Sequence, residues 1–329
     1  LMMSRILVSG LFLFLFTACI NDNMTSSSEL KVSISDVYFD DQLSSASGIE
    51  NRNHSLYIIG DDIPWLLEID FDFNVKTKFR LAGTDTLVNG RTPKDLKADF
   101  EALGFLNDTN LLVLSSGSLN HTRDTAYIFN IYSDNLINKK NIRPLYESIK
   151  KHVNMSIEHE INLEGLAISG NNVYMLHRGN VSENFIVRIN KLDFNSYLYS
   201  SDTIPSFEVF WFDLPTSNDL ISGFSGACMH PNDSEIIFCA SMEKTNDEVN
   251  DGEIVGSYVG IIPLTTLSKG KYTATLLREN DKISRYKLEG LCVKDSPEGL
   301  NNSNYVSLLG VCDNDDGTSY FLDLQMITN

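Results

Sequence analysis

Five residues at one position of a repeated pattern have side chains suited to binding a metal ion. The pattern is an apolar strand, a polar turn and a second apolar strand, as in EGLAISGNNVYMLHRGN, and is typical of a β-hairpin. It occurs five times, and successive copies begin 54 to 64 residues apart. The residues that begin the copies are Ser47, Glu101, Glu164, Ser225 and Glu289. A repeat of this length with several strands predicts a β-propeller.

These five positions would form a ring, because the first strand of each propeller blade lines the central channel. Three carboxylates in a partly dehydrated channel repel one another unless their pKa values rise or a cation binds. Calcium accepts six to eight oxygen ligands at about 2.3 to 2.6 Å, whereas softer metals prefer the histidine or cysteine that the ring lacks. We therefore predict calcium on the axis. The alternative is that the glutamates accept hydrogen bonds from backbone N–H groups and from water.

The remaining strands must hold this ring in place. Each copy is followed by a third apolar strand, and four copies by a fourth: VKTKFRLAG, NIRPLYESI, FEVFWFDL and KYTATLLRE. The fifth copy has no fourth strand, so the alternating segment 30–39 would complete it and close the ring. We therefore expect an all-β protein, a five-bladed β-propeller with four-stranded blades, as a single domain over residues 30–329.

The N-terminal segment predicts export and lipid attachment. Arg5 precedes the apolar run 6–16, which is too short to span a membrane and is followed by Thr-Ala-Cys. Residues 1–18 would be a lipoprotein signal peptide, Cys19 the lipidated residue and 19–29 a flexible tether. The alternative is an ordinary signal peptide with Cys19 incidental. Lipidation would place the protein in a bacterial cell envelope, on the outer membrane facing the periplasm or the cell surface, with the lipid as its only membrane contact.

Composition excludes some partners and chemistries. With 44 acidic and 26 basic residues the net charge is -18, which disfavours nucleic acid as a partner. The six histidines are scattered, and strand-end hydrogen bonding is expected of His177 and His230. The four cysteines after Cys19 lie on apolar strands and are expected to be free and buried. Nucleophile-elbow and phosphate-loop motifs are absent from the sequence. We expect a monomer.

Polar residues end the second strands and would surround the mouth of the channel. The predicted mouth is acidic and comprises Asp61, Asp62, Ser116, Ser241, Glu243, Asp313 and Asp315. Arg178 ends the second strand of the third copy, and its guanidinium is suited to holding two phosphate oxygens. Asp61 and Asp313 would hold a second cation or position water, or would be solvated strand ends.

The order Ser, Glu, Glu, Ser, Glu resembles the calcium ligands of the calcium-activated nucleotidases, or apyrases, which are five-bladed propellers with calcium on the axis. The segments GFSGACMHPNDSEIIFCASMEKTND and KLEGLCV look like that family's fourth and fifth blades. In outline the resemblance covers residues 30–329. It implies that the five ring residues bind calcium. The Glu-Gly-Leu copies and the DNDDG stretch also resemble the esterase-like phytase propellers.

Three functions follow as hypotheses. The first is a calcium-dependent hydrolase of phosphoester or phosphoanhydride bonds, acting on a small phosphorylated substrate. The second is a noncatalytic ligand-binding or scaffold propeller in which calcium is structural. The third is a glycosidase with paired channel carboxylates. An open mouth with Arg178 reaching inward would favour the first, and a mouth plugged by residues 243–253 would favour the second.

Overall fold

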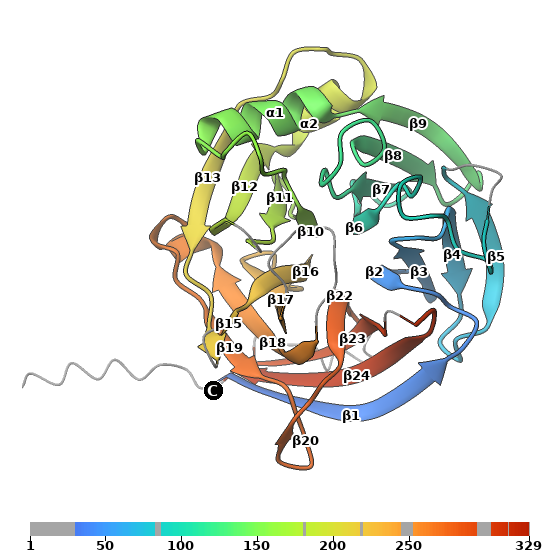
Figure 1. The fold of residues 1–329 in the computed structure, drawn as a ribbon, viewed down its shortest axis with the longest axis vertical. Coiled ribbons are helices and arrows are strands. Elements are labelled where there is room, and N and C mark those ends of the chain that lie inside the picture. Colours follow the sequence, from blue (N-terminus) through green and yellow to red (C-terminus); the bar gives the residue numbers. More distant parts are fainter. Residues whose placement is uncertain are drawn as a thin grey trace, which may run out of the picture.

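Five four-stranded antiparallel sheets surround a central axis, so the protein is an all-β, five-bladed β-propeller (Figure 1). The structure is a computed structural model, and it describes residues 30–82, 87–179, 182–217, 220–244, 253–294, 304–314 and 316–328. The prediction of fold class and blade number is confirmed. The predictions for residues 1–29, including Cys19, concern residues outside the described ranges, as do those for Asp315 and for most of the segment 243–253.

The blades run outward from the axis in chain order. The innermost strands are β2 (Ala46–Arg52), β6 (Phe100–Phe105), β10 (Leu163–Ile168), β16 (Gly223–Met229) and β22 (Lys287–Val293). The second strands are β3 (Ser55–Gly60), β7 (Asn110–Ser115), β11 (Asn172–His177), β17 (Glu235–Glu243) and β23 (Tyr305–Asp313). The third strands are β4 (Trp65–Ile69), β8 (Thr125–Asn130), β12 (Asn184–Asn190), β18 (Ile254–Pro263) and β24 (Ser319–Thr328). The outer strands are β5 (Val75–Arg80), β9 (Asn135–Asn141), β13 (Phe207–Phe212), β19 (Thr273–Leu276) and β1 (Leu30–Asp40).

The ring is closed by the first strand of the described chain. β1 pairs antiparallel with β24, from Leu30 opposite Thr328 to Asp40 opposite Ser319, and thereby joins the sheet that contains the C-terminal strands (Figure 1). This pairing confirms the predicted closure. It covers the edge of β24, which would otherwise be exposed between the first and last blades.

One predicted strand was wrong. The segment NIRPLYESI was expected to be the fourth strand of the second blade, but β9 takes that place and the segment continues as helix α1 (Arg143–His152). Pro144 stands at the start of the helix, where a missing N–H costs little. Leu145, Tyr146 and Ile149 share a face that is fully buried against the blades, so helical spacing matches the available core better than strand alternation does.

Several short elements of the structure were not predicted from the sequence. Helix α2 (Lys191–Tyr199) follows β12, and the side chain of Asn190 accepts hydrogen bonds from the N–H groups of Leu192 and Asp193. A 3-10 helix, η1 (Leu264–Lys269), follows β18. Two small ribbons pair β14 (Thr216–Ser217) with β15 (Leu220–Ile221) and β20 (Arg278–Glu279) with β21 (Lys282–Ile283).

Every ring residue is the extra residue of a β-bulge. In each blade the pairing of the innermost and second strands skips one residue, and the skipped residues are Ser47, Glu101, Glu164, Ser225 and Glu289. A bulge leaves its extra residue unpaired and re-aims its side chain. The repeated position found in the sequence is therefore a repeated backbone irregularity that can turn five side chains toward the axis.

A glycine follows four of the five ring residues because the innermost strands approach closely. A Cβ atom on Gly226 would lie 2.6 Å from the carbonyl oxygen of Glu289 and 3.0 Å from the Cα atom of Gly290. A side chain at this position would force neighbouring blades apart. The Glu-Gly and Ser-Gly pairs in the sequence thus combine a side chain for the channel with a close contact between blades.

The core lies between adjacent blades and is made mostly of side chains from the inner three strands of each, with additions from α1, α2 and some outer strands. The four cysteines are free and buried within it, as expected: Cys228, Cys239, Cys292 and Cys312. Within the described ranges, none of the helices has the length and apolar character needed to cross a membrane.

Candidate metal centre and mouth pocket

The ring residues surround a small axial cavity. Four of them, Ser47, Glu101, Glu164 and Glu289, line a cavity of about 10 Å³, and the two residues after Ser225 complete its wall. That space is about enough for one water molecule or an ion. The structure therefore brings the predicted positions to one place on the axis, while their role as calcium ligands stays a prediction.

The two serines of the ring hold adjacent blades together. The hydroxyl of Ser47 donates to the carbonyl oxygen of Phe100, the residue before Glu101. The hydroxyl of Ser225 donates at 2.6 Å to the carbonyl oxygen of Leu288, the residue before Glu289. Each serine is thus bonded to the innermost strand of the next blade. This arrangement gives both hydroxyls a structural role that needs no metal.

Two of the three ring glutamates are paired with buried basic residues. Arg178 donates to Glu243 at 2.7 Å and to Glu164 at 3.3 Å, and lies 3.9 Å from Glu289. The ammonium of Lys287 lies 3.0 Å from Glu243 and 3.1 Å from Glu289. Arg178, the predicted phosphate ligand, is 4% exposed. Its guanidinium points toward the ring glutamates, as the first hypothesis required, but it already donates hydrogen bonds to Glu164 and Glu243.

Glu101 is the ring residue that differs. Its side chain is 9% exposed, and the described part of the chain gives it no hydrogen bond and no ion pair. Burial raises its pKa well above the ordinary value, and the carboxylates of Glu164 and Asp99 raise it further. Of the three ring glutamates, Glu101 is therefore the one whose negative charge has no basic partner among the described residues.

An acidic cluster lies beside Glu101, off the axis. Asp61, Asp99 and Glu101 each offer one oxygen atom, and these oxygens all lie within 4.8 Å of one another. Oxygens on opposite sides of a calcium ion are separated by about twice the metal–oxygen distance of 2.3 to 2.6 Å. The cluster could therefore hold a metal ion. It unites two predicted residues, Asp61 and Glu101, with one that was missed.

Asp99 and Lys287 could have been found from the repeat. Each stands two residues before a ring residue, at the position that Asn162 occupies in the third copy. The side-chain amide of Asn162 donates to Glu164 at 2.6 Å. Aligning the copies at this second position would have predicted a further layer of polar side chains above the ring.

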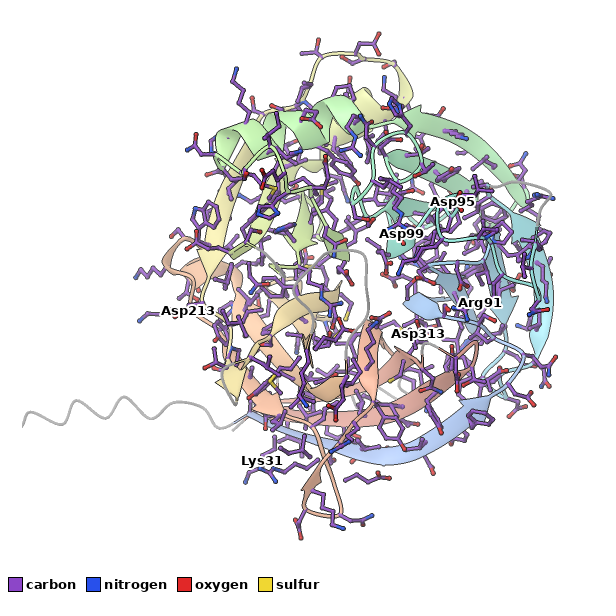
Figure 2. All side chains as sticks on the ribbon, viewed as in Figure 1. Lys31, Arg91, Asp95, Asp99, Asp213 and Asp313 are labelled. Atoms are coloured by element: carbon purple, nitrogen blue, oxygen red, sulfur yellow. The ribbon has the colours of Figure 1, made fainter. Side chains whose placement is uncertain are left out.

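A larger pocket opens at the channel mouth. Its volume is about 240 Å³, and it is lined by Asp61, Asp62, Arg91, Thr92, Lys94, Lys97 and Asp313. In Figure 2, Arg91, Asp99 and Asp313 are labelled on the same side of the central opening. The predicted residues Asp61 and Asp313 thus meet in one pocket. Its three basic residues come from the connection between β5 and β6, whose sequence does not recur in the equivalent connections between the other blades, so the repeat gave no sign of them.

The basic residues of this mouth pocket have different partners. Arg91 is paired with Asp62, and Lys97 is paired with Asp61 and, at 2.7 Å, with Asp99. Lys94 is exposed and forms no ion pair with any described residue. One side chain is therefore available to an anion without breaking an existing contact.

The charges around the channel do not balance. Among the described residues, eight carboxylates line the axial cavity or the mouth pocket or belong to the ion-pair networks that reach them: Asp61, Asp62, Asp99, Glu101, Glu164, Glu243, Glu289 and Asp313. Six basic residues of the same pockets and networks accompany them: Arg91, Lys94, Lys97, Arg123, Arg178 and Lys287. With every group ionised, the difference is two negative charges, which one divalent cation would neutralise; without a cation, the raised pKa values of Glu101 and Glu289 favour protonation, which reduces the difference.

Two other polar residues of the predicted mouth have structural partners, whereas the buried hydroxyl of Ser241 has no hydrogen-bond partner among the described residues. Ser116 donates its hydroxyl hydrogen to Asp99, and Glu243 is paired with Arg178. Both histidines form the expected strand-end hydrogen bonds: His177 Nδ1 accepts from the N–H of Asn162 at 3.0 Å, and His230 Nδ1 accepts from that of Asn232 at 3.2 Å.

The fold and the site define a class, a five-bladed β-propeller with an acidic central channel. Within it, the chain belongs to a family of unknown function, DUF6929, which matches residues 42–326. No curated protein matches the chain.

Several solved structures are similar to the chain at low identity. Glutaminyl cyclase from Myxococcus xanthus is 10% identical, with a TM-score of 0.43 over 92% of this chain and 99% of its own. Regucalcin, a calcium-binding protein from Agrobacterium tumefaciens, is 11% identical, with a TM-score of 0.43 over 88% of this chain and 94% of its own. A protein of unknown function from Bacteroides thetaiotaomicron is 11% identical, with a TM-score of 0.40 over 90% of this chain and 76% of its own. The resemblance to the calcium-activated nucleotidases stays a prediction.

Proposed function

We propose that this protein binds calcium at the mouth of its central channel and, with the calcium bound, binds a small phosphorylated compound in the mouth pocket. The observation that supports this most directly is the position of Asp61. Its side chain belongs both to the acidic cluster with Asp99 and Glu101 and to the wall of the mouth pocket. A cation held by the cluster would therefore lie next to a ligand in the pocket.

Calcium is favoured among the common cations by the chemistry of the donors. The cluster offers carboxylate oxygens alone, which suit a hard cation. Calcium accepts a flexible set of carboxylate and water ligands, whereas magnesium requires near-ideal octahedral geometry with bonds of about 2.0 to 2.1 Å. The excess of two negative charges around the channel favours a divalent ion over a monovalent one.

The mouth pocket favours a small anionic ligand once the cation is bound. Arg91, Lys94 and Lys97 line it, and Lys94 is open to a new partner. A phosphoryl group can accept hydrogen bonds from such side chains while one of its oxygens contacts the cation. A volume of about 240 Å³ is below the range of roughly 300 to 1,000 Å³ typical of sites for drug-sized ligands. We therefore favour a phosphomonoester over a nucleoside triphosphate.

The proposal is tested by calorimetric titration of chelator-treated protein, first with calcium chloride and then with phenyl phosphate at saturating calcium. We expect one calcium per protein, a higher melting temperature with calcium, and phenyl phosphate binding only when calcium is present. A ligand at one hundred times its dissociation constant stabilises the folded state by about 2.7 kcal/mol. Equal melting temperatures in chelator and in excess calcium would contradict the proposal.

Hydrolysis of the bound phosphoester is a second candidate function. It is favoured by the shared position of Asp61, because the same cation would polarise a phosphoryl oxygen and lower the pKa of a bound water. Asp313, which also lines the pocket, would orient that water. Release of phosphate from aryl phosphates, phytate or nucleotides in the presence of calcium distinguishes a hydrolase from a protein that only binds.

A further inference from the structure

Lys97 lies between the acidic cluster and the mouth pocket and contacts both. Its ammonium is paired with Asp61 and, at 2.7 Å, with Oδ1 of Asp99. The same side chain lines the mouth pocket. Only 8% of Lys97 is exposed, so this ammonium is held almost entirely by groups of the protein. It occupies the place where a cation at the cluster would need to bind Asp99.

Asp99 has one oxygen that is open to exchange. Its Oδ2 accepts hydrogen bonds from the hydroxyl of Ser118 and from Arg123, both at 3.0 Å, and from the hydroxyl of Ser116. Its Oδ1 is the atom that Lys97 contacts. An ammonium and a divalent cation therefore compete for Oδ1 of Asp99, while the contacts to Oδ2 keep the carboxylate in place.

The other two members of the cluster, Asp61 and Glu101, have acceptor oxygens that Lys97 does not contact. The ammonium contacts Oδ2 of Asp61, whereas Oδ1 of Asp61 is buried and has no hydrogen-bond partner among the described residues. Glu101 is 9% exposed, lines the axial cavity, and forms no hydrogen bond or ion pair within the described ranges. Asp61 and Glu101 belong to one cluster, so the cluster has more carboxylate charge and more acceptor capacity than one ammonium satisfies.

We propose that Lys97 is a built-in competitor of the cation. In the absence of a cation its ammonium holds Asp61 and Asp99 together, and a divalent cation bound by Asp61, Asp99 and Glu101 displaces it into the mouth pocket. There the ammonium joins Arg91 and Lys94 as a third positive group facing an anionic ligand. Cation and anion then favour each other's binding, because the cation frees a group that the anion uses. This inference rests on the cation binding proposed above.

Two lysine variants test the exchange. Lys97→Met keeps the length of the side chain and removes the competing charge, so its calcium affinity should rise at least about tenfold. At saturating calcium it should bind phenyl phosphate more weakly than the natural protein does. Lys94→Met is the matched control, because Lys94 lines the mouth pocket but contacts no member of the cluster. It should leave calcium affinity unchanged and weaken only the binding of phenyl phosphate.

A measurement on the unsubstituted protein keeps the inference testable if Lys97→Met does not fold. An amine-reactive label, followed by mass spectrometry of peptides, reports how accessible each lysine is. Calcium should increase the labelling rate of Lys97 several-fold and leave that of Lys94 unchanged. A lower labelling rate for Lys97, or no change at saturating calcium, would overturn the inference.

The outcomes separate this inference from the proposed function. If the protein binds calcium but no phosphate ester, the proposed ligand is wrong, while a tighter calcium affinity of Lys97→Met still supports the competition. If calcium binds and Lys97→Met binds it equally or more weakly, the competition is wrong and Lys97 is a structural brace. If neither the protein nor Lys97→Met binds calcium, both proposals fail.

Discussion

Glu101 and Glu164 occupy equivalent positions in neighbouring blades, yet their surroundings differ. Glu164 accepts hydrogen bonds from Asn162 and Arg178, whereas Glu101 has neither partner and stands beside Asp61 and Asp99. The five-residue ring would bind calcium through both glutamates. The off-axis cluster would use Glu101 alone, so the two arrangements make different predictions for single substitutions.

Glu101→Gln should weaken calcium binding at least about tenfold, or by about 1.4 kcal/mol, because it removes the cluster's uncompensated carboxylate. Glu164→Gln should change calcium affinity less than threefold, since Glu164 is already satisfied by Arg178 and Asn162. Calorimetric titration of each variant measures both effects. Equal losses in the two variants would favour calcium on the axis, bound by the whole ring.

The same substitution has a signature in pH. The pKa of Glu101 is raised in the folded protein by burial and by the nearby carboxylates. Its contribution to stability is therefore present below the ordinary pKa of a glutamate and is lost as pH rises through the raised value. Without calcium, Glu101→Gln should be more stable than the natural protein. The difference in unfolding free energy, measured with urea, should grow as pH rises from 5 to 8. A gain that is constant across this range would exclude the raised pKa as its cause.

At the scale of elements, the innermost strands combine two functions in adjacent residues. The bulged residue lines the axial cavity in four blades, and the glycine that follows it in four blades permits contact with the next blade. These demands are local, so they recur in the sequence as Glu-Gly and Ser-Gly. Blade two carries Ala102 in place of glycine, which shows that the spacing is less tight there.

Gly226→Ala should destabilise the protein by about 2 to 3 kcal/mol, in the upper part of the range for an overpacked core. The added Cβ would lie 2.6 Å from the carbonyl oxygen of Glu289, which is backbone and cannot move independently of its blade. Gly170→Ala is the control, because the nearest atom there is a carboxylate oxygen of Asp233 at 3.3 Å. It should change stability by less than about 0.5 kcal/mol. Similar urea midpoints for the two variants would contradict this account of the glycine.

At the scale of the whole molecule, the sites are confined to one end of a closed ring. The basic groups of the mouth pocket come from the connection between the first two blades, and Asp313 comes from the last blade. Closure by β1 brings the first and last blades together. The mouth pocket therefore depends on the ring being complete, and a ligand bound there would connect both sides of the closure.

Lipid attachment at Cys19 is a prediction about the location of the molecule. If Cys19 carries the lipid, the protein should fractionate with membranes, and Cys19→Ala should move it to the soluble fraction, because the anchor is lost while the propeller is unchanged. Immunoblotting of fractions from cells that produce each form measures this. A natural protein that is equally soluble would show that the segment before the propeller is an ordinary signal peptide.

The sequence by itself determined the number of blades, the position of each innermost strand, the closing strand and the five channel residues. These features depend on strand alternation and on a bulge at the same position of each innermost strand, which are local and leave a repeated pattern. The error at NIRPLYESI has a local cause as well, because its apolar residues fit a short helix as well as a strand. Only the packed blades revealed which periodicity buries them.

Only the tertiary structure decided which of the channel residues are open to a ligand. Arg178 looked like a free phosphate ligand in the sequence, but Glu243, 65 residues away, satisfies it in the fold. The lysines of the mouth pocket lie in a connection without a repeated counterpart, and Asp99 joins Asp61 from another blade. Ion pairs between blades depend on how the ring closes in space, and spacing along the chain does not encode those distances.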